Sequence, residues 1–483
     1  MRILAIDHGT TSTRAILVDP AGRIAAEARR PFTQHYPKPG WVEHDPLEIW
    51  KTVVASVNAV CRKSPGPIAA VGITNQRETT VVWDRQTGKP VYNAIVWQCR
   101  RTADACRKLA PHAALFRART GLPLDAYFSG TKIRWILDHV KPANPARLAF
   151  GTIDSWLLWK LTDGKTHATD FTNASRTLCF NIHERRWDPR LCKLLGVPVA
   201  ILPKVKKSMD DYGTVSAIPA LAGVPILGVA GDQQAALFGQ TCFTRGQAKC
   251  TYGTGAFLLM NTGKSAIHSK RGLITTLAAG ADGACLYALE GAVFIAGAAI
   301  QWLRDELKLI KHSADSEKAA RAVPDNAGVY LVPAFVGLGA PHWDMNARGT
   351  IVGLTRGANR NHLIRATLES IAFQVADLLD AMQADTGIKI PELAVDGGAV
   401  ANNFLMQFQS DILKIPVQRP ANIESTALGA AYLAGLKAGI WKTARELATK
   451  RHVNRTFKPA MRSAERLRLR DGWNHALRQT RTR

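Results

Sequence analysis

The stretch Gly231-Asp232-Gln233-Gln234-Ala235-Ala236-Leu237-Phe238-Gly239 follows an apolar run over residues 224–230 and places one acid between a strand and a helix. The apolar run predicts a buried strand, and the alanine-rich residues after Asp232 predict a helix. In open α/β folds, ligands bind at the carboxyl edge of the sheet, where such a strand ends. A carboxylate fixed there can accept a proton from a substrate hydroxyl, although an acid in this position can also simply cap the helix.

Two similar strand–turn–strand segments, one near each end of the chain, predict two halves with related folds. In the first half, the strand patterns of residues 2–6 and 15–18 flank a turn rich in glycine and hydroxyl groups. In the second half, residues 249–252 and 256–260 flank Gly253-Thr254-Gly255. Strands, long helical patterns and glycine turns together predict an α/β fold. We expect a division near residues 240–246, with one domain over residues 1–245 and another over residues 246–483.

Composition and charge narrow the class of protein. The chain has 483 residues, of which 46% are apolar, enough for several buried cores. The net charge of +25 favours polyanionic ligands such as nucleotides. Basic residues are dispersed without a nucleic-acid motif, so we expect no specific nucleic-acid partner. No apolar run approaches the ~20 residues of a membrane span, and we expect no transmembrane segment and a cytoplasmic location.

Several known kinds of site are excluded by spacing. The eight cysteines form no CxxC pair and the thirteen histidines no HExxH motif, so neither a disulfide framework nor a zinc site is indicated. The chain also lacks GxxxxGK[ST], which excludes a P-loop enzyme, and the HRD and DFG motifs of protein kinases.

The two Gly-Thr turns are candidate phosphate clamps. Glycine lets the backbone approach an anion, so that successive N–H groups can point toward it. The hydroxyl groups of Thr10, Thr11, Ser12 and Thr254 and the guanidinium of Arg14 add further donors. Either turn alone could be an ordinary hairpin turn, but two in matching positions favour phosphate binding. Gly397-Gly398, between a predicted strand and helix, is a weaker signal of the same kind.

A polar cluster at a strand end, residues 72–80, could bind a small polyol. Adjacent Arg77 and Glu78 supply fixed donors and an acceptor, although a surface ion pair is the alternative. Trp97 and Phe257 could form apolar walls of such a site, or could simply pack in a core.

Two longer motifs carry a resemblance to a known family. Residues 127–139, YFSGTKIRWILDH, and residues 349–369, which begin GTIVGL, fit the two signatures of the FGGY carbohydrate kinases. The chain resembles this family, part of the sugar kinase–actin superfamily, from Ile3 to about Leu436. Residues 72–80, 93–101 and 231–234 resemble the elements of members that phosphorylate glycerol. The resemblance implies two RNase H-like domains of the actin and sugar-kinase type, with a ligand cleft between them.

The resemblance also implies a role for individual residues. Asp232 is expected to be the general base, and Asp7 the acid that positions Mg²⁺ through water. The polyol is expected to contact Arg77, Glu78, Tyr127, Asp232 and Gln233, with Trp97 and Phe257 against its carbon chain. The nucleotide is expected to contact Thr10, Thr11, Ser12, Arg14, Thr254, Gly297, Gln301, Gly398 and Asn402.

The implied reaction is ATP-dependent phosphorylation of glycerol to sn-glycerol 3-phosphate and ADP, by a homo-oligomer that is a dimer or tetramer. A kinase for another small polyol or a ketose is the alternative within the same class. An actin-like or chaperone-like ATPase, or a basic nucleic-acid-binding protein with an inactive kinase fold, would leave Arg77, Glu78 and Asp232 unexplained. His8 stands where relatives often carry Gln, and we expect it at the edge of the cleft.

Overall fold

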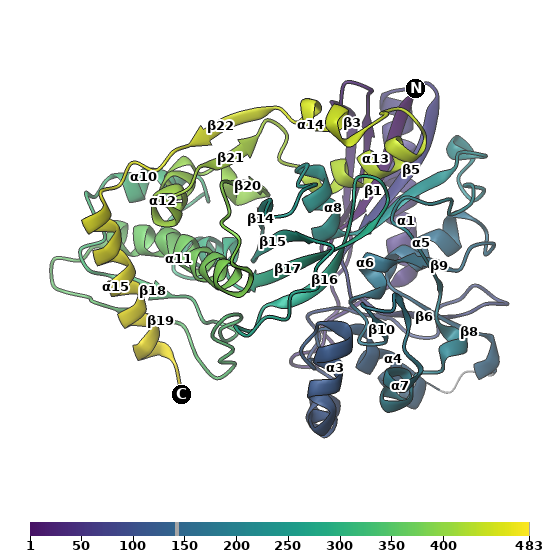
Figure 1. The fold of residues 1–483 in the computed structure, drawn as a ribbon, viewed down its shortest axis with the longest axis horizontal. Helices are drawn as coiled ribbons and strands as arrows, with labels where there is room; N and C mark the ends of the chain where they lie inside the picture. The colour runs from purple at the N-terminus through teal and green to yellow at the C-terminus, as the bar shows by residue number, and fades with distance from the viewer. Residues whose placement is uncertain (141–143, 483) are drawn as a thin grey trace.

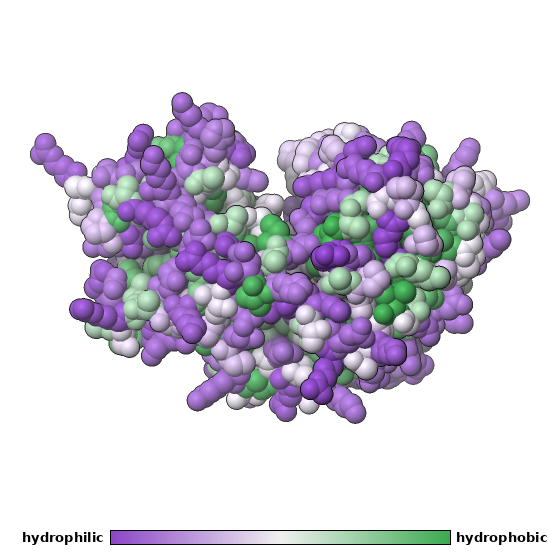
Figure 2. Space-filling view, turned by 90° about the horizontal axis from the view of Figure 1, so that it is seen from above, coloured by the Kyte–Doolittle hydropathy of each residue, from purple (hydrophilic) through white to green (hydrophobic). Residues whose placement is uncertain are grey.

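The computed structural model describes residues 1–140 and 144–482. The chain forms two lobes, each built on a β-sheet (Figure 1). A space-filling view from above shows a notch between the lobes (Figure 2). The C-terminal segment 462–483 is rich in arginine, and its last residue, Arg483, lies outside the described residues.

The first lobe is built on a five-stranded sheet that carries the opening turn. Its strands are β1 Arg2–His8, β2 Ser12–Val18, β3 Ile24–Pro31, β5 Ile68–Asn75 and β13 Ile226–Gly231, in the order β13-β5-β1-β2-β3. β1 pairs antiparallel with β2 and parallel with β5, which in turn pairs parallel with β13. Helix α1 (Pro46–Lys63), capped by Asp45, packs on β2 and β3. The carboxyl ends of β1, β5 and β13 therefore meet at one edge of the sheet.

The second lobe repeats this arrangement within a larger sheet. Its strands are β14 Ala248–Tyr252, β15 Ala256–Gly263, β16 Ile274–Ala279, β17 Cys285–Val293, β20 Leu393–Asp396, β21 Val417–Pro420 and β22 Val453–Phe457, in the order β16-β17-β15-β14-β20-β21-β22. The five strands β17-β15-β14-β20-β21 match β3-β2-β1-β5-β13 in order and in direction. The predicted two-domain α/β fold with related halves is confirmed, and the two Gly-Thr turns occupy equivalent positions.

The remaining elements cover the sheets or extend the lobes. The short strand β4 Glu43–His44 precedes α1 and pairs with β7 Ala94–Ile95. Besides β7, the chain between β5 and β13 forms β6 Val81–Asp84, β8 Leu148–Gly151, β9 Ala168–Asp170, β10 Phe180–Asn181, β11 Arg186–Trp187, β12 Lys204–Lys206, α2 Ala103–Lys108, α3 Ala113–Thr120, α4 Ser129–His139, α5 Ile153–Leu161, α6 Phe171–Ala174 and α7 Pro189–Leu195. The second lobe adds α9 Gly297–Asp305, α10 Asp315–Arg321, β18 Tyr330–Val332, β19 Thr350–Val352, α11 Arg360–Thr386, α12 Asn403–Leu413, α14 Ala444–Lys450 and α15 Ser463–Thr480. In the part of the chain that the structure describes, no helix is both long and apolar enough to cross a membrane.

Two helices join the lobes. α8 (Asp232–Gly239) follows β13, whereas α13 (Ser425–Lys437) comes from the second half of the chain and packs on β1, β5, β13 and α8. The contacts are so close that a Cβ on Gly429 would lie 1.8 Å from the Ala235 carbonyl oxygen, and one on Gly239 would lie 2.0 Å from that of Ser425. Glycine is therefore required at this crossing. The second half of the sequence thus returns to the first lobe, and the division at residues 245 and 246 stays a prediction.

Candidate active site

Asp232 lies at the junction of β13 and α8, at the carboxyl edge of the first sheet. Gly231 is the helix cap and Asp232 is the first helical residue, so the acid is not the N-cap. A Cβ on Gly231 would lie 2.7 Å from the side chain of Arg77, which explains glycine before the acid. The Asp232 side chain keeps 27% of its surface exposed, and its Oδ1 lies 3.2 Å from Arg77 Nε. Burial raises the pKa of Asp232 above its usual range, against the charges of Arg77 and Lys249.

Four fully enclosed charged side chains form a network beside Asp232. Arg77 donates from Nη1 to Glu290 Oε2 at 2.5 Å and from Nη2 to Glu290 Oε1 at 3.0 Å. Arg176 donates from Nε to Glu78 Oε1 at 2.6 Å and from Nη2 to Glu290 Oε1 at 3.0 Å. Arg77 and Glu78 are each 2% exposed and Arg176 and Glu290 0%, so the alternative of a surface ion pair is wrong.

The backbone at Glu78 is held in an unusual conformation. Its φ of 60° lies in the left-handed region, which costs a non-glycine residue about 1 kcal/mol or more. The Glu78 carbonyl oxygen accepts hydrogen bonds from Ser129 Oγ at 3.0 Å and Thr80 Oγ1 at 3.1 Å. These hydroxyls fix the turn that carries both Arg77 and Glu78, and strain of this kind is typical of functional sites.

Three buried charged residues of this region were not singled out in the sequence: Arg176, Lys249 and Glu290. Glu290 is a lone acid within the otherwise apolar strand pattern of residues 285–293, which is a usable signal. Lys249 donates from Nζ to Gln233 Oε1 at 2.5 Å and to Thr251 Oγ1 at 2.8 Å. Since an ammonium group only donates, Gln233 must present its oxygen to Lys249 and keep its amide N–H groups for other partners.

Aromatic side chains connect the polyol cluster to the first turn. Trp97 Nε1 donates to Thr10 Oγ1 at 3.0 Å, and the Trp97 and Tyr127 rings meet edge to face with centroids 5.5 Å apart. Burial raises the pKa of the Tyr127 phenol, which stays protonated. Phe257, on β15, is half-buried, and its carbonyl oxygen lies 3.5 Å from Lys249 Nζ. Trp97 is thus joined to a predicted phosphate clamp and is not simply a core residue.

The first turn joins β1 to β2 and has polar residues on both sides. Gly9 N donates to the Ser12 carbonyl at 3.0 Å, while Ser12 Oγ accepts from Arg29 at 2.7 Å and Thr11 is exposed. Arg14 pairs with Glu27 at 3.2 Å and with Glu424, just before α13.

Asp7 faces Arg14 across the β1–β2 pair, beside the first turn. Burial raises its pKa to about 6; Arg14 opposes this rise, and nearby Asp232 adds to it. Within residues 1–140 and 144–482, no group of three or more His, Cys, Asp or Glu side chains is arranged to hold a metal ion. A carboxylate beside a predicted phosphate turn fits Mg²⁺, which usually takes one or two carboxylates together with phosphates.

The second turn gathers most of the other predicted nucleotide residues. Gly297 N donates to the Gly253 carbonyl at 3.0 Å, and Ala298 N donates to that of Thr254 at 3.0 Å. The start of α9 therefore packs on the turn, and Gln301 lies one turn further along that helix. The 397–398 turn also lies against the second turn, because a Cβ on Gly397 would lie 2.6 Å from the carbonyl oxygen of Tyr252, the residue before Gly253.

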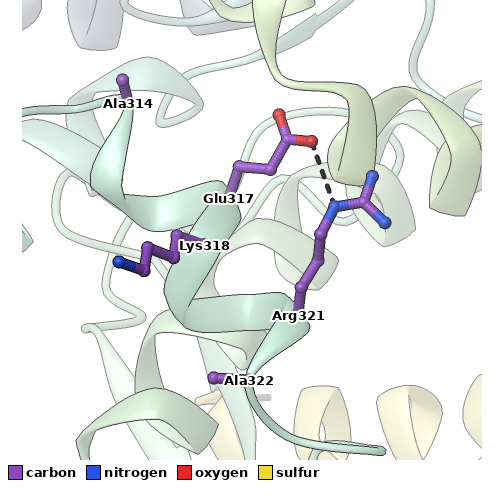
Figure 3. A pocket seen from close by; sticks show the side chains of 5 residues that line it. All are labelled: Ala314, Glu317, Lys318, Arg321 and Ala322. Carbon is purple, nitrogen blue, oxygen red and sulfur yellow. Dashed lines mark hydrogen bonds and ion pairs between the residues drawn. The ribbon is translucent and has the colours of Figure 1, made fainter.

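Asn402 caps α12 and lies beside α10 in the second lobe. Its Nδ2 donates to Ser316 Oγ at 3.2 Å, and the next residue's N–H donates to Glu317 Oε2 at 2.8 Å. Both partners lie on α10, and residues on and next to this helix line an open surface pocket of about 590 Å³ (Figure 3). In the close-up, Glu317 and Arg321 pair with each other and Lys318 points away from them. The structure thus brings Gly297 and the 397–398 turn against the second turn, and it places Asn402 beside α10.

His8 does not lie at the edge of the cleft, and this expectation is wrong. The residue is 0% exposed, its Nδ1 lies 2.9 Å from Thr13 Oγ1, and its ring stacks on Phe32 with centroids 4.9 Å apart. Gln76 Nε2 lies 3.3 Å from Nε2 of His8. The cause is the strand alternation, which turns residue 8 into the space between β1 and α1 while Asp7 faces the opposite way. Burial lowers the pKa of His8 to about 3, with a further contribution from His44.

The fold and site define an α/β protein of the sugar-kinase class. Family models for the N-terminal and C-terminal domains of the FGGY family of carbohydrate kinases match residues 2–239 and 248–438. The chain therefore belongs to the FGGY family of carbohydrate kinases.

Relatives with known names are similar over almost their whole length. A glycerol kinase of Carboxydothermus hydrogenoformans is 60% identical over 99% of this chain and 98% of the relative, and one of Symbiobacterium thermophilum is 58% identical with the same coverage. The crystal structure of Plasmodium falciparum glycerol kinase with ADP superimposes with a TM-score of 0.92, at 37% identity, over 99% of this chain and 98% of that one. A gluconate kinase from Lactobacillus acidophilus, at 22% identity and a TM-score of 0.88, supports the fold alone.

Proposed function

We propose that this protein is a glycerol kinase, which transfers the γ-phosphoryl group of ATP to glycerol and yields sn-glycerol 3-phosphate and ADP. One observation carries the proposal: Asp232 Oδ1 lies 3.2 Å from Arg77 Nε, beside buried Glu78, and Trp97 of the same region is hydrogen-bonded to Thr10 of the first turn. Relatives named glycerol kinase, 58–60% identical over nearly the full length, support the choice of substrate.

The chemistry follows from the positions of these side chains. Asp232 accepts the proton of a terminal glycerol hydroxyl while the oxygen of that hydroxyl attacks the γ-phosphorus of ATP. The bond between the γ-phosphorus and the leaving ADP then breaks. Arg77 and Glu78 bind adjacent hydroxyls, and Trp97 and Phe257 pack on the carbon chain. Because phosphoryl transfer depends mostly on positioning, holding the hydroxyl in line accounts for much of the rate.

The nucleotide binds across both turns. Thr10, Thr11, Ser12 and Arg14 hold its phosphates from the first lobe, and Thr254, Gly297, Gln301, Gly398 and Asn402 hold it from the second. The magnesium ion that accompanies ATP supplies charge neutralisation at the phosphates, and Asp7 would hold it. The ADP named with the Plasmodium falciparum relative supports a nucleotide site in this fold.

A coupled assay with ATP and glycerol tests the proposal. Glycerol should be phosphorylated with a higher kcat/KM than xylulose, gluconate or other small polyols. Preference for a ketose would favour the alternative of another sugar kinase. ATP hydrolysis that is independent of every polyol would favour an actin-like ATPase.

We also propose a cellular location and an oligomeric state for the enzyme. All eight cysteines are free thiols, which fits a reducing compartment, and we place the enzyme in the cytoplasm, where ATP is available. We expect a homo-oligomer, and a mass measurement in solution would give its size. No specific nucleic-acid partner is proposed, and nothing in the structure explains the net charge of +25.

A further inference from the structure

Glu290 is a fully buried acid in the middle of β17, between Leu289 and Gly291 on the second sheet. An ionised carboxylate without partners would be very costly in such surroundings. Burial opposes its ionisation, but Arg176 and Arg77 overcome that effect and lower its pKa to about 2. Glu290 is therefore a charged group that the second lobe inserts among side chains of the first.

The bonds of Glu290 determine the orientation of Arg77. Both Nη atoms of Arg77 donate to the Glu290 carboxylate, at 2.5 and 3.0 Å, in a two-point contact that fixes the guanidinium plane. Arg77 Nε is then left 3.2 Å from Asp232 Oδ1. If Glu290 lost its charge, Asp232 would be the nearest carboxylate for the whole guanidinium group.

Arg176 extends the same control to Glu78. It donates to Glu290 Oε1 at 3.0 Å and to Glu78 Oε1 at 2.6 Å, so it links the two acids. Its guanidinium also lies 5.7 Å from the ring centroid of Tyr127 and 5.3 Å from that of Phe128. Arg176 Nη1 has no hydrogen-bond partner among the described residues. Arg176 thus contacts Glu78 and Tyr127, two of the side chains that the family resemblance assigns to the polyol.

We propose that Glu290, acting through Arg77 and with Arg176, is a positioning residue of the polyol site that is supplied by the second lobe. It keeps the guanidinium of Arg77 from pairing fully with the general base, and it completes the polyol site when the lobes are arranged as seen here. This inference rests on the proposed function. Stability alone is a weak reason for such a network, because apolar side chains of the same volume often stabilise a protein as well as buried ion pairs do.

The test compares Glu290→Gln with the wild-type enzyme. The amide has the same size but no charge, so Arg77 should turn toward Asp232. We expect the glycerol KM to rise by about tenfold or more and kcat to fall, while the ATP KM stays within about twofold. Asp188→Asn is the matched control: Asp188 is also a buried acid, 3% exposed and paired with Arg119 at 2.6 Å, but outside the network. It should lower the melting temperature and leave both KM values within about twofold.

A double variant separates positioning from stability. Arg176→Met combined with Glu290→Gln removes one charge of each sign, so it should recover melting temperature relative to Glu290→Gln. The glycerol KM should nevertheless stay high, because Arg77 still lacks its two-point partner and Glu78 has also lost Arg176. A glycerol KM restored together with the melting temperature would overturn the inference, as would an unchanged glycerol KM in Glu290→Gln. If the single variant does not fold, the double variant decides.

The wild-type assay keeps the two proposals apart. Absence of glycerol phosphorylation by the wild type would contradict the proposed function itself. If the wild type phosphorylates glycerol but Glu290→Gln raises the glycerol and ATP KM values equally, only the positioning role of Glu290 is contradicted. The proposed function then stands. If the wild type prefers another polyol or a ketose, the same KM comparison on that substrate decides the inference.

Discussion

The two ends of the cleft use the same sheet architecture in different ways. The end that we propose for the polyol consists of charged side chains that are almost completely buried and paired, with Arg77 2% and Glu290 0% exposed. The end that we propose for the nucleotide consists of glycine turns, backbone N–H groups and hydroxyls, and a Cβ on Gly255 would lie 2.5 Å from the Val293 carbonyl oxygen. Small neutral hydroxyls require fixed donors and acceptors, whereas a polyphosphate requires close approach of the backbone.

The largest expected effect is on the chemical step, at Asp232. Asp232→Asn should lower kcat by about 10²- to 10⁴-fold, because an amide cannot accept the hydroxyl proton. Binding of ADP, measured by calorimetry, should survive, since the nucleotide contacts lie elsewhere. A variant that keeps more than about a tenth of the wild-type kcat would rule out the assignment of the base.

Arg77→Ala should affect the polyol end selectively. The change removes donors to glycerol and leaves Glu290 buried without one of its partners. We expect the glycerol KM to rise by about 10- to 100-fold, with a nearly unchanged ATP KM, in steady-state kinetics at saturating co-substrate. An equal rise in both KM values would place Arg77 outside the polyol pocket. The melting temperature should be recorded beside the kinetics, because an unpaired buried carboxylate also destabilises the fold.

Gly297→Ala is the reciprocal change at the nucleotide end. Its Cβ would lie 2.5 Å from the Gly253 carbonyl oxygen, so the second turn must shift. The ATP KM should rise by about three- to tenfold, as expected for local overpacking, while the glycerol KM stays constant. Gly398→Ala would meet no protein atom within 4 Å, so a rise in its ATP KM would report contact with the nucleotide itself and not a shift of the turn. A rise in the glycerol KM of Gly297→Ala would contradict the separation of the two ends.

The smallest expected effect concerns His8, a buried residue at the end of β1 that contacts Thr13 and Phe32. Its folded-state pKa of about 3 lies below the unperturbed value of 6.5, so the unfolded chain binds the proton more readily. Its contribution to stability is therefore present above pH 6.5 and is lost as the pH falls toward 3. His8→Gln should reduce the loss of unfolding free energy between pH 7.5 and pH 5 by about 2 kcal/mol, measured by urea unfolding. Equal losses in both proteins would mean that His8 is protonated in the folded state.

The sequence alone predicted the elements and the general layout of the site. The strand before Asp232, the helix after it and both Gly-Thr hairpins depend on local periodicity and on turn residues, which a single chain displays directly. Arg77 and Glu78 could be identified as a pair because they are adjacent. The equivalence of the two sheets was also predictable, because each begins with the same strand–turn–strand pattern.

The tertiary structure alone decided which distant charges meet. Arg77, Arg176 and Glu290 are separated by about a hundred residues or more, and no periodicity indicates that two buried arginines share one acid. The return of α13 to the first sheet depends on close contacts at Gly72, Gly239 and Gly429, which become visible only when the helices cross. His8 was misplaced for a similar reason: its burial depends on Phe32 and α1, and local sequence specifies polarity but not which face of a strand another element covers.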